Sequence, residues 1–352
     1  MIFDPILDIF RGKAVTIPPL DGAFRPNTSL DDADIFATLS EPDNLAVWNG
    51  NLIAGSGSAL FRIAADSEPV VVETLQSPVT ALAVSPAAEL TVGMENGKLL
   101  IAGKENPLPG EIGCITALAY GEDGALWLAN GSANYAPSGW SADLMQKGSS
   151  GSLWKREAGG REFKKIAGHI AYPYGLHPTK DGVFVSESWS HRILHVDGSG
   201  NRKTVLDHLP GYPARLSQAA GGGAWLALFA PRNRLIEFVL QESRYRLDMM
   251  AEVPREYWIA PALASNRSFL EPLQCGGIKT MGIHKPWSPS RSYGLVVRLD
   301  AAMRPLHSLH SRANGDRHGI CSAVEMNGQV YAASKGGDCV LSLSGISQEA
   351  LA

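Results

Sequence analysis

The sequence has few charged residues and no long hydrophobic run. Only 19% of its 352 residues are charged, and 31 basic against 35 acidic side chains give a net charge of −4. Nucleic-acid-binding proteins carry a basic stripe or patch, so this balance argues against that class. No apolar segment approaches the roughly 20 residues that a membrane-spanning helix needs. We therefore expect neither nucleic acid nor a membrane as a partner.

Cysteine is scarce, and its spacing points to no metal or disulfide framework. The four cysteines are Cys114, Cys275, Cys321 and Cys339, and no two of them form a CxxC pair. Charged residues interrupt the first 21 positions, so this stretch lacks the layout of a signal peptide. There is also no HExxH zinc motif and no GxxxxGK[ST] phosphate loop. These absences predict a soluble cytoplasmic protein with reduced thiols and no cofactor.

What the sequence does contain is a repeat of short apolar strands separated by polar turns. Asp-Gly and Asn-Gly pairs between runs of β-branched and aromatic residues indicate hairpins. Equivalent points in six copies are Ala46, Ala83, Ala119, His177, Ser217 and Ala323. Their successive spacings are 37, 36, 58, 40 and 106 residues. About 40 residues per four-stranded unit is typical of a propeller blade.

The pattern therefore predicts an all-β fold, a six-bladed β-propeller with lid insertions in blades three and five. The alternative is a seven-bladed propeller with its extra blade in the 106-residue gap. Residues 294–299 and 306–309 resemble the outer strands of blade five, which favours six blades. We expect an N-terminal extension at 1–33 and one propeller domain at 34–352. Pairing of residues 34–40 with the last blade would close the ring and remove exposed sheet edges.

The surplus residues fall at 131–150 in blade three and at 231–291 in blade five. Both lie between the second and third strands of their blades, so both are expected to cover the same mouth of the channel. A helix is expected within 237–256. Loops over a rigid scaffold often carry ligand sites. The alternative is that both insertions are decorative, because surface loops tolerate extra length at small cost.

Several motifs resemble the strictosidine synthase-like family of six-bladed propellers, relatives of the gluconolactonase (SMP-30) type. They include Tyr172–Leu176 (YPYGL), Leu209–Pro213 (LPGYP) and Tyr293–Leu299 (YGLVVRL). The similarity extends in order along residues 34–344. It implies the propeller fold. The resemblance does not single out one function, because the family includes alkaloid-forming enzymes, hydrolases and proteins of other kinds.

The resemblance also bears on metal binding. Lactonase-like relatives hold a channel calcium with an acid from the first blade and with Asn, Asn and Asp from later blades. The matching positions here are Asp43, Thr116, Tyr174 and Ala214. Calcium takes six to eight oxygens, several from carboxylates or amides. Only Asp43 keeps such a group, so calcium is disfavoured, although backbone carbonyls remain as alternative ligands for a cation.

Two sets of catalytic residues are conceivable. Asp43 would act as general acid or base if it were a lone carboxylate with a raised pKa in a dry channel; otherwise it caps a strand. Cys321 aligns with the glutamate on which strictosidine synthases rely. With His318 nearby it would be a nucleophile if a cation lowered its pKa; otherwise it is buried packing. We name Asp43 and His318 as candidate catalytic residues.

A further group is expected to line the mouth and bind substrate. It consists of Thr116, Asn130, Tyr135, Tyr174, Trp189, Arg215 and Cys321. Arg215 would attract an anion or pair with Asp43, and Glu187 with Arg192 is expected to form a salt bridge. Aromatic residues of the insertions, namely Trp140, Tyr257, Trp258, His284 and Trp287, favour an aromatic or apolar small-molecule ligand.

Three functions fit these observations. The leading one is a small-molecule hydrolase acting on a lactone or ester. The second is a non-catalytic propeller that binds a small molecule. The third is a condensing enzyme of the Pictet–Spengler type, which the missing glutamate at Cys321 disfavours.

Overall fold

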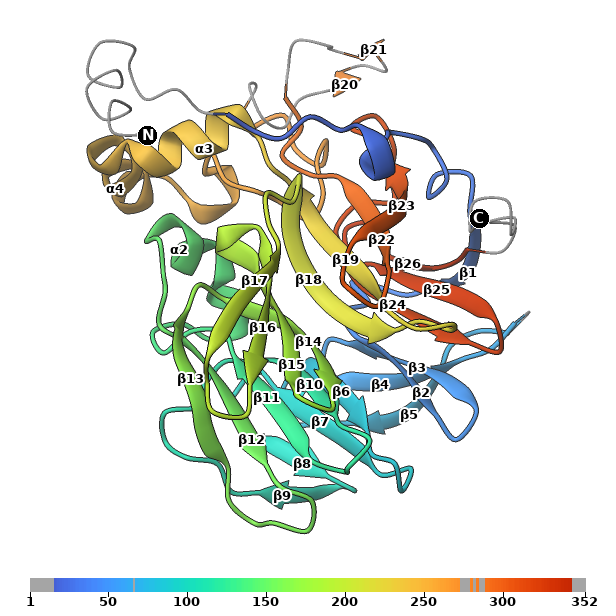
Figure 1. The fold of residues 1–352 in the computed structure, drawn as a ribbon. Coiled ribbons are helices and arrows are strands. Elements are labelled where there is room, and N and C mark those ends of the chain that lie inside the picture. Colours follow the sequence, from blue (N-terminus) through green and yellow to red (C-terminus); the bar gives the residue numbers. More distant parts are fainter. Residues whose placement is uncertain (1–15, 66, 273–278, 281–282, 285–288, 344–352) are drawn as a thin grey trace.

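The computed structural model describes residues 16–65, 67–272, 279–280, 283–284 and 289–343, the two short pairs by their backbone alone. Within these residues, six four-stranded antiparallel sheets surround a central channel (Figure 1). The six-bladed prediction is confirmed. The seven-bladed alternative is wrong, because the strands Gly294–Leu299 and Pro305–Ser311 complete blade five. The other two strands described in the gap, Lys279–Thr280 and Ile283–His284, form only a two-stranded sheet.

The first three blades follow one another along the chain, each ordered from the channel outward. Blade one consists of β2 (Leu45–Trp48), β3 (Asn51–Ser56), β4 (Ala59–Ile63) and β5 (Val70–Thr74). Blade two consists of β6 (Val79–Val84), β7 (Leu90–Met94), β8 (Leu99–Ile101) and β9 (Lys104–Asn106). Blade three consists of β10 (Ile115–Tyr120), β11 (Leu126–Asn130), β12 (Gly151–Arg156) and β13 (Lys164–Ile170).

The remaining blades include the closure of the ring. Blade four consists of β14 (Pro173–Thr179), β15 (Gly182–Glu187), β16 (Arg192–Asp197) and β17 (Arg202–Leu206). Blade five consists of β18 (Gly211–Gln218), β19 (Ala224–Pro231), β22 (Gly294–Leu299) and β23 (Pro305–Ser311). Blade six consists of β24 (Ile320–Met326), β25 (Gln329–Ser334), β26 (Cys339–Ser342) and β1 (Asp34–Thr38).

Strand β1 comes from the N-terminal side and pairs with β26 from the C-terminal side. The register joins Asp34 to Ser342 and Thr38 to Cys339. This is the closure that the sequence predicts at residues 34–40. Because β1 is the outer strand of blade six, the two ends of the described chain complete one sheet.

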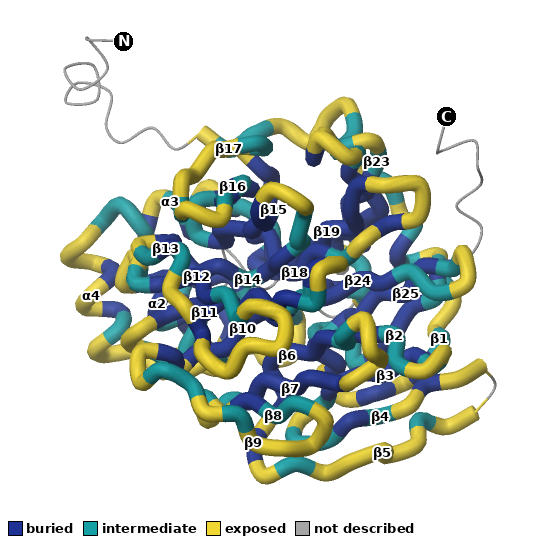
Figure 2. The backbone as a smooth tube through the Cα atoms, turned by 60° about the horizontal axis from the view of Figure 1, so that its bottom comes forward, coloured by how far each residue is buried: buried dark blue, intermediate teal, exposed yellow. Residues whose placement is uncertain are grey.

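The strands follow from local turn chemistry and from burial. Asn49 and Gly50 both have positive φ, at 49° and 73°, as the two-residue turn between β2 and β3 requires. Asn327 and Gly328 repeat this arrangement in blade six. The inner strands are buried between neighbouring blades, whereas outer strands such as β5 face solvent (Figure 2). The core is therefore a ring of apolar contacts between sheets.

Five of the six innermost strands, all except β2, are irregular where they enter the channel. Strands β6, β10, β14 and β24 carry one extra residue opposite their neighbours, at Thr80, Thr116, Tyr174 and Cys321. In β18, Ala214 and Arg215 together lie opposite the single residue Ala227. Such bulges bend a strand and leave the extra residue outside the ladder. The bulges therefore determine which groups face the channel.

The helices lie in the two insertions and in short connections. The 3₁₀ turns are η1 (Gly22–Phe24), η2 (Pro137–Gly139), η3 (Ser188–Ser190) and η4 (Arg255–Tyr257). The α-helices are α2 (Trp140–Met145), α3 (Arg234–Gln241) and α4 (Ser243–Glu252), and the second insertion also holds β20 (Lys279–Thr280) and β21 (Ile283–His284). The helical region expected at 237–256 is thus two helices separated at Glu242. Asn233 caps α3 by accepting hydrogen bonds from Leu235 N and Ile236 N.

The two insertions contact each other. The Arg255 guanidinium of the second insertion donates hydrogen bonds to Ser141 Oγ, at 2.6 Å, and to the Ser138 carbonyl in the first. Helices α2, α3 and α4 lie together at one side of the ring (Figure 1). The insertions therefore lie on the same face. Among the described residues, no helix has the length and apolarity to cross a membrane.

Candidate functional site

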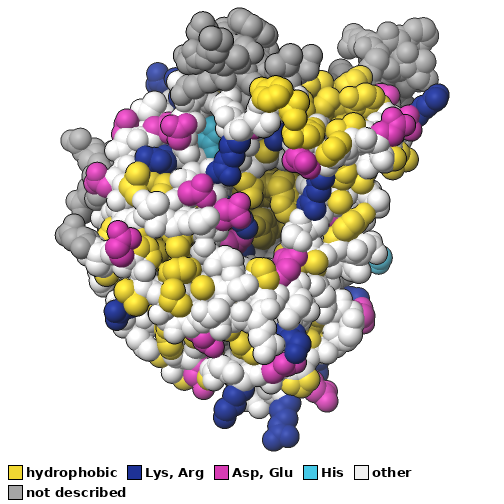
Figure 3. Space-filling model, turned by 180° about the vertical axis from the view of Figure 1, so that it is seen from behind, with side chains coloured by type: hydrophobic (Ala, Val, Ile, Leu, Met, Phe, Trp, Pro, Cys, Tyr) yellow, Lys and Arg dark blue, Asp and Glu magenta, His cyan; other side chains and the backbone are white. Residues whose placement is uncertain are grey.

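A cavity of about 490 Å³ opens at the mouth of the channel beside the insertions. All six blades and both insertions contribute to its lining. Charged and polar lining groups include Glu41, Asp43, Thr80, Glu95, Thr116, Ser138, Arg215 and Lys335; the apolar and aromatic ones include Trp140, Tyr172, Tyr174, Phe229 and Leu263. The face in Figure 3 is hollowed, with hydrophobic side chains in the hollow and charged ones around it.

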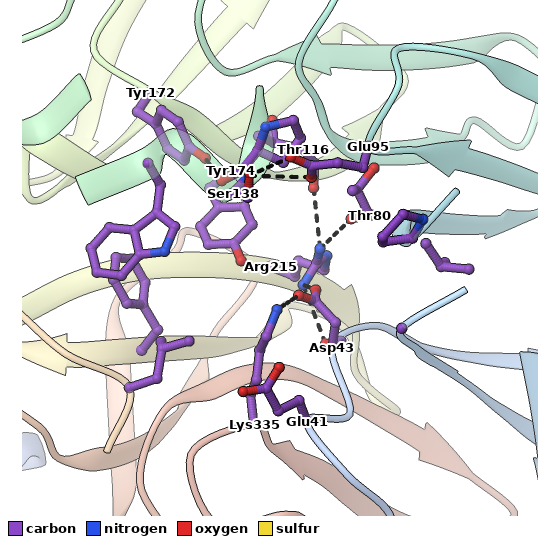
Figure 4. Close-up of a pocket in the computed structure, with 17 residues that line it drawn as sticks. Glu41, Asp43, Thr80, Glu95, Thr116, Ser138, Tyr172, Tyr174, Arg215 and Lys335 are labelled. Carbon is purple, nitrogen blue, oxygen red and sulfur yellow. Dashed lines mark hydrogen bonds and ion pairs between the residues drawn. The ribbon is translucent and has the colours of Figure 1, made fainter. Parts of the chain in front are cut away.

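Three charged side chains meet on the cavity floor (Figure 4). Arg215 Nη1 lies 2.6 Å from Asp43 Oδ1, and the Lys335 ammonium donates a hydrogen bond to Asp43 Oδ2. Burial alone would raise the pKa of Asp43, but the charges of Arg215 and Lys335 outweigh it and hold the pKa below 3.8. Burial alone would lower the pKa of Lys335, and Asp43 raises it instead. At neutral pH the floor therefore holds two positive charges and one negative charge.

The Arg215 guanidinium also binds the backbone of four other positions. Nη1 donates to the carbonyl oxygens of Asp43, at 3.3 Å, and Cys321, at 3.4 Å. Nη2 donates to the carbonyls of Thr80 and Thr116. These acceptors belong to blades one, six, two and three, so a single side chain from blade five joins five blades at the channel axis.

Tyr174 lies beside this charged group. The Arg215 guanidinium carbon lies 5.0 Å from the centre of its ring, within the range of a cation–π contact. Burial raises the pKa of Tyr174 well above 10, and the Asp43 charge adds to this effect. The phenol therefore remains protonated, and its hydroxyl interacts with the Cys321 side chain.

One wall of the cavity is aromatic. Phe229 contacts Trp140 and Tyr174 edge to face, at centroid distances of 5.3 and 5.7 Å. Trp189 lies behind this wall and stacks on Tyr172 at 4.3 Å. Because the rings restrain one another, the wall is a preformed apolar surface.

Two acidic side chains, the buried Asp143 and the partly exposed Glu95, hold the first insertion over the cavity. Asp143 of α2 accepts a hydrogen bond from Trp189 Nε1 at 2.8 Å and another from Ser132 Oγ at 2.6 Å. Glu95, which follows β7, accepts from the Ser138 backbone N–H at 2.9 Å. The bonds to Trp189 and Glu95 connect the insertion to blades four and two, and the bond to Ser132 lies within the insertion.

The structure brings together four of the residues predicted from the sequence. Asp43, Thr116, Tyr174 and Arg215 all line the cavity. The expectation that Asp43 is a lone carboxylate with a raised pKa is wrong, because two cations contact it and lower its pKa. The Thr116 hydroxyl donates to the Pro173 carbonyl at 2.5 Å, so its proton is already used within the fold.

Three other predicted residues lie outside the cavity lining. Asn130 is buried and accepts backbone hydrogen bonds from Gly113 and Cys114, at 3.1 and 2.8 Å. Tyr135 lies in the loop before α2, and Trp189 supports the aromatic wall from behind. The predicted salt bridge between Glu187 and Arg192 is confirmed, at 2.5 Å.

His318 and Cys321 do not form a reactive pair in this structure. His318 Nδ1 lies 2.7 Å from Ser292 Oγ, and Nε2 lies 2.8 Å from the Arg312 carbonyl. Both ring nitrogens thus have partners, and His318 does not line the cavity. Burial raises the pKa of Cys321 to about 12, and the Asp43 charge contributes to the rise. The expectation of a thiolate activated by a nearby cation is therefore wrong.

The aromatic residues of the insertions separate into different positions. Trp140 lines the cavity, and Tyr257 lines a smaller neighbouring one. Trp258 is buried and donates a hydrogen bond to the Val253 carbonyl. Trp287 and the side chain of His284 lie outside the described residues.

Sequence reasoning missed Lys335 and Glu95, although a positional signal for them exists. Each is the first residue after the second strand of its blade, and so is Gly57. All three line the cavity. A comparison of this position across the repeats would have found the lysine.

The residues present do not fit a channel calcium ion. Both oxygens of the Asp43 carboxylate already contact cations, and four carbonyls that face the axis are bound by Arg215. A third cation there would lie against two like charges. Among the described residues, no cluster of three or more His, Cys, Asp or Glu side chains is placed to hold a metal.

Comparison with known sequences gives distant relatives. No protein-family model matches the chain. Adipocyte plasma membrane-associated proteins of Danio rerio and Salmo salar are 25% and 24% identical over 258 and 265 residues. The matches cover 61% and 64% of this chain, and the chain spans only 60% and 64% of those relatives.

Comparison with solved structures gives the same fold. A gluconolactonase from Xanthomonas campestris matches with a TM-score of 0.52 and 14% identity, over 90% of this chain and 87% of its own. Regucalcin, a calcium-binding protein from Agrobacterium tumefaciens, matches with a TM-score of 0.53 and 12% identity, over 94% and 96%. The chain therefore has the propeller fold of gluconolactonase and regucalcin.

Proposed function

We propose that the protein is a metal-independent hydrolase of a small lactone or ester, with its site in the cavity at the channel mouth. The observation that carries the proposal is the charge on the floor, where Lys335 and Arg215 share the single carboxylate of Asp43. Hydrolysis of a lactone or ester passes through a tetrahedral oxyanion. A positive charge held in place before the reaction stabilises such an intermediate.

The cavity walls define the kind of substrate. A volume of about 490 Å³ suits a small molecule. Trp140, Phe229 and Leu263 offer apolar contact to a ring or alkyl group. The substrate carbonyl would face Lys335, whose side chain is 26% exposed and therefore reachable from the cavity.

The proposed reaction uses side chains that line the cavity, namely Lys335, Glu41 and Asp43. Water adds to the carbonyl carbon, and the carbonyl oxygen becomes an oxyanion beside the Lys335 ammonium. Glu41 lines the cavity and, among the described residues, its carboxylate has no hydrogen bond or ion pair, so it can accept the water proton. The bond between the carbonyl carbon and the alkoxy oxygen breaks, and the alkoxide takes that proton. Asp43 keeps Lys335 in position and does not act as the base.

A second candidate is a propeller that binds a small molecule without transforming it. The observation that favours it is Thr80, which lines the cavity and whose buried hydroxyl has no hydrogen-bond partner among the residues that the structure describes. Unpartnered buried hydroxyls are costly, and a ligand would satisfy this one. The low pKa of Asp43 also removes the strongest candidate base.

The test is a panel of lactones and aryl esters with the purified full chain in the presence of a chelator. We expect turnover to persist, and Lys335→Met to lower kcat/KM by about 10²–10³-fold. Lys335→Arg should retain part of the activity, and Lys98→Met is the matched control because Lys98 forms an exposed pair with Glu105. Loss of activity on chelation, or full activity in Lys335→Met, contradicts the proposal. A compound that raises the Tm without turnover supports the binding function instead.

We also infer a cytoplasmic location. Cys114, Cys321 and Cys339 are buried, and within the described part of the chain they form no disulfide, which is usual for proteins of reducing compartments. Cell fractionation tests this inference, and recovery of the protein in a secreted or membrane fraction would contradict it.

A further inference from the structure

Five oxygen atoms converge on the Arg215 guanidinium. Four are the backbone carbonyls of Asp43, Thr80, Thr116 and Cys321, and the fifth is Asp43 Oδ1. We call these five atoms the oxygen ring. The five atoms belong to blades one, two, three and six, whereas Arg215 belongs to blade five. The guanidinium is therefore supplied by a blade that contributes none of the five oxygen atoms.

The bulges explain why these carbonyls are available. Thr80, Thr116 and Cys321 are each the extra residue of a bulge, so none of them is paired in the ladder. Asp43 precedes the first paired residue of β2, Leu45. In blade five the bulge also contains Arg215 itself. Bulges thus free three of the four carbonyl acceptors, and another bulge positions Arg215, their donor.

Carbonyl and carboxylate oxygens converging from several segments are the ligands that hard cations take in proteins. Without a cation, four buried carbonyls would lose their partners and the Asp43 carboxylate would keep only Lys335. The ring has a place for one positive group, and the four N–H donors on Nη1 and Nη2 match its carbonyls.

We propose that the oxygen ring is a cation-binding site whose cation is permanently attached to the chain as the Arg215 side chain. It follows that removing this side chain creates a site for a free cation of the guanidinium class. The proposal concerns the cation that the ring holds, and it stands whether or not the cavity above it hydrolyses a substrate.

The test compares wild type with Arg215→Ala by thermal unfolding in low-millimolar guanidinium chloride. The substitution should lower the Tm by about 5–10 °C, because it leaves a buried carboxylate and several carbonyls unsatisfied. Guanidinium should restore most of this loss, whereas tetramethylammonium chloride, which has no N–H donors, should restore none. Calorimetry should show one guanidinium site in Arg215→Ala and none in wild type. An absent Tm loss or an absent guanidinium response overturns the proposal.

Arg298 supplies a matched control. Its side chain is also buried and also binds carbonyls, namely those of Ala220, Gly222 and Leu299, but all three lie in blade five. Among the described residues Arg298 forms no ion pair at contact distance, although the charges of Glu325 and Asp300 act on it. Arg298→Ala should lose stability without regaining it in guanidinium. Equal recovery in this variant would overturn the proposal. The double variant Asp43→Asn/Arg215→Ala should have lost the guanidinium response, because the ring then lacks its charge.

Two further variants keep the test informative if Arg215→Ala does not fold. Arg215→Lys retains a positive group that can reach the ring, and Arg215→Gln removes the charge at similar length. We expect Arg215→Lys to melt about 5 °C above Arg215→Gln. Equal melting temperatures would show that the ring does not require a cation, which overturns the proposal.

Discussion

Asp43 and Lys335 lie 292 positions apart in the sequence and form an ion pair across the junction between blades one and six. Asp43 precedes β2, and Lys335 follows β25. The pair therefore connects the two ends of the ring at the cavity floor. Removing one partner of a buried pair typically costs about 3–5 kcal/mol, because the other charge is left uncompensated.

The first prediction concerns stability in acid. The folded pKa of Asp43 lies below 3.8, so its contribution to the free energy of unfolding is present above pH 3.8 and is lost as pH falls through the folded value. We expect Asp43→Asn to show a flatter decline in unfolding free energy between about pH 4 and pH 2 than wild type. Urea denaturation at each pH measures this slope. Glu105→Gln, at an exposed pair, is the control, and parallel slopes for wild type and Asp43→Asn would refute the prediction.

The second prediction concerns the reactivity of Cys321. Its pKa of about 12 leaves almost no thiolate at neutral pH, and its side chain is buried. We expect iodoacetamide to leave Cys321 unlabelled in the folded protein and to label it in urea, as read by mass spectrometry of peptides. Cys321→Ala should retain the activity or ligand binding of the wild type. Rapid labelling in the native state would revive the nucleophile hypothesis.

The third prediction concerns the packing of β14 against β18. A Cβ atom at Gly175 would lie 2.3 Å from the Ala214 carbonyl oxygen and 2.9 Å from Arg215 Cα. Backbone atoms cannot yield as a flexible side chain does, so Gly175→Ala should destabilise the protein by about 1–3 kcal/mol and displace the bulge that positions Arg215. Chemical denaturation measures the loss. Gly110→Ala, where a Cβ meets nothing within 4 Å, should change stability by less than about 0.5 kcal/mol.

The fourth prediction concerns the contact between the insertions. Arg255→Ala removes the hydrogen bonds to Ser141 and Ser138. We expect amide hydrogen exchange in residues 131–150 to become about tenfold faster, while exchange in the blades stays unchanged. Mass spectrometry of exchanged peptides provides the measurement. Arg244→Ala is the comparison because the Arg244 side chain is 97% exposed, and equal exchange in both variants would rule out the contact as an anchor.

The blades were predictable because their signals are local. Asn-Gly pairs require turns of a particular kind, and apolar runs of strand length recur at blade spacing, so strand positions follow from neighbouring residues. The placement of Asp43, Thr116 and Tyr174 at the cavity also followed from the repeat, because each precedes its equivalent point by three residues.

The electrostatics of the site were not predictable in the same way. The pKa of Asp43 depends on Lys335 and Arg215, which come from other blades and reach the carboxylate only in the closed ring. The sequence offered Arg215 as a partner. The repeat position of Lys335 indicates a place at the cavity, but it does not indicate the contact with Asp43. Likewise, the partners of His318 are Ser292 and the Arg312 carbonyl, and nothing in the motif around His318 indicates them.

The closure of blade six has a consequence for the order of events during synthesis. Strand β1 leaves the ribosome first, but its partner β26 comes about 300 residues later, and Lys335 emerges only shortly before that partner. Joining segments so far apart carries an entropic cost that cannot be offset until both exist. The nascent chain therefore carries Asp43 without Lys335 until the 292 positions that separate them have been translated. Chains released early, before β25 is complete, would have formed blades but no working cavity floor.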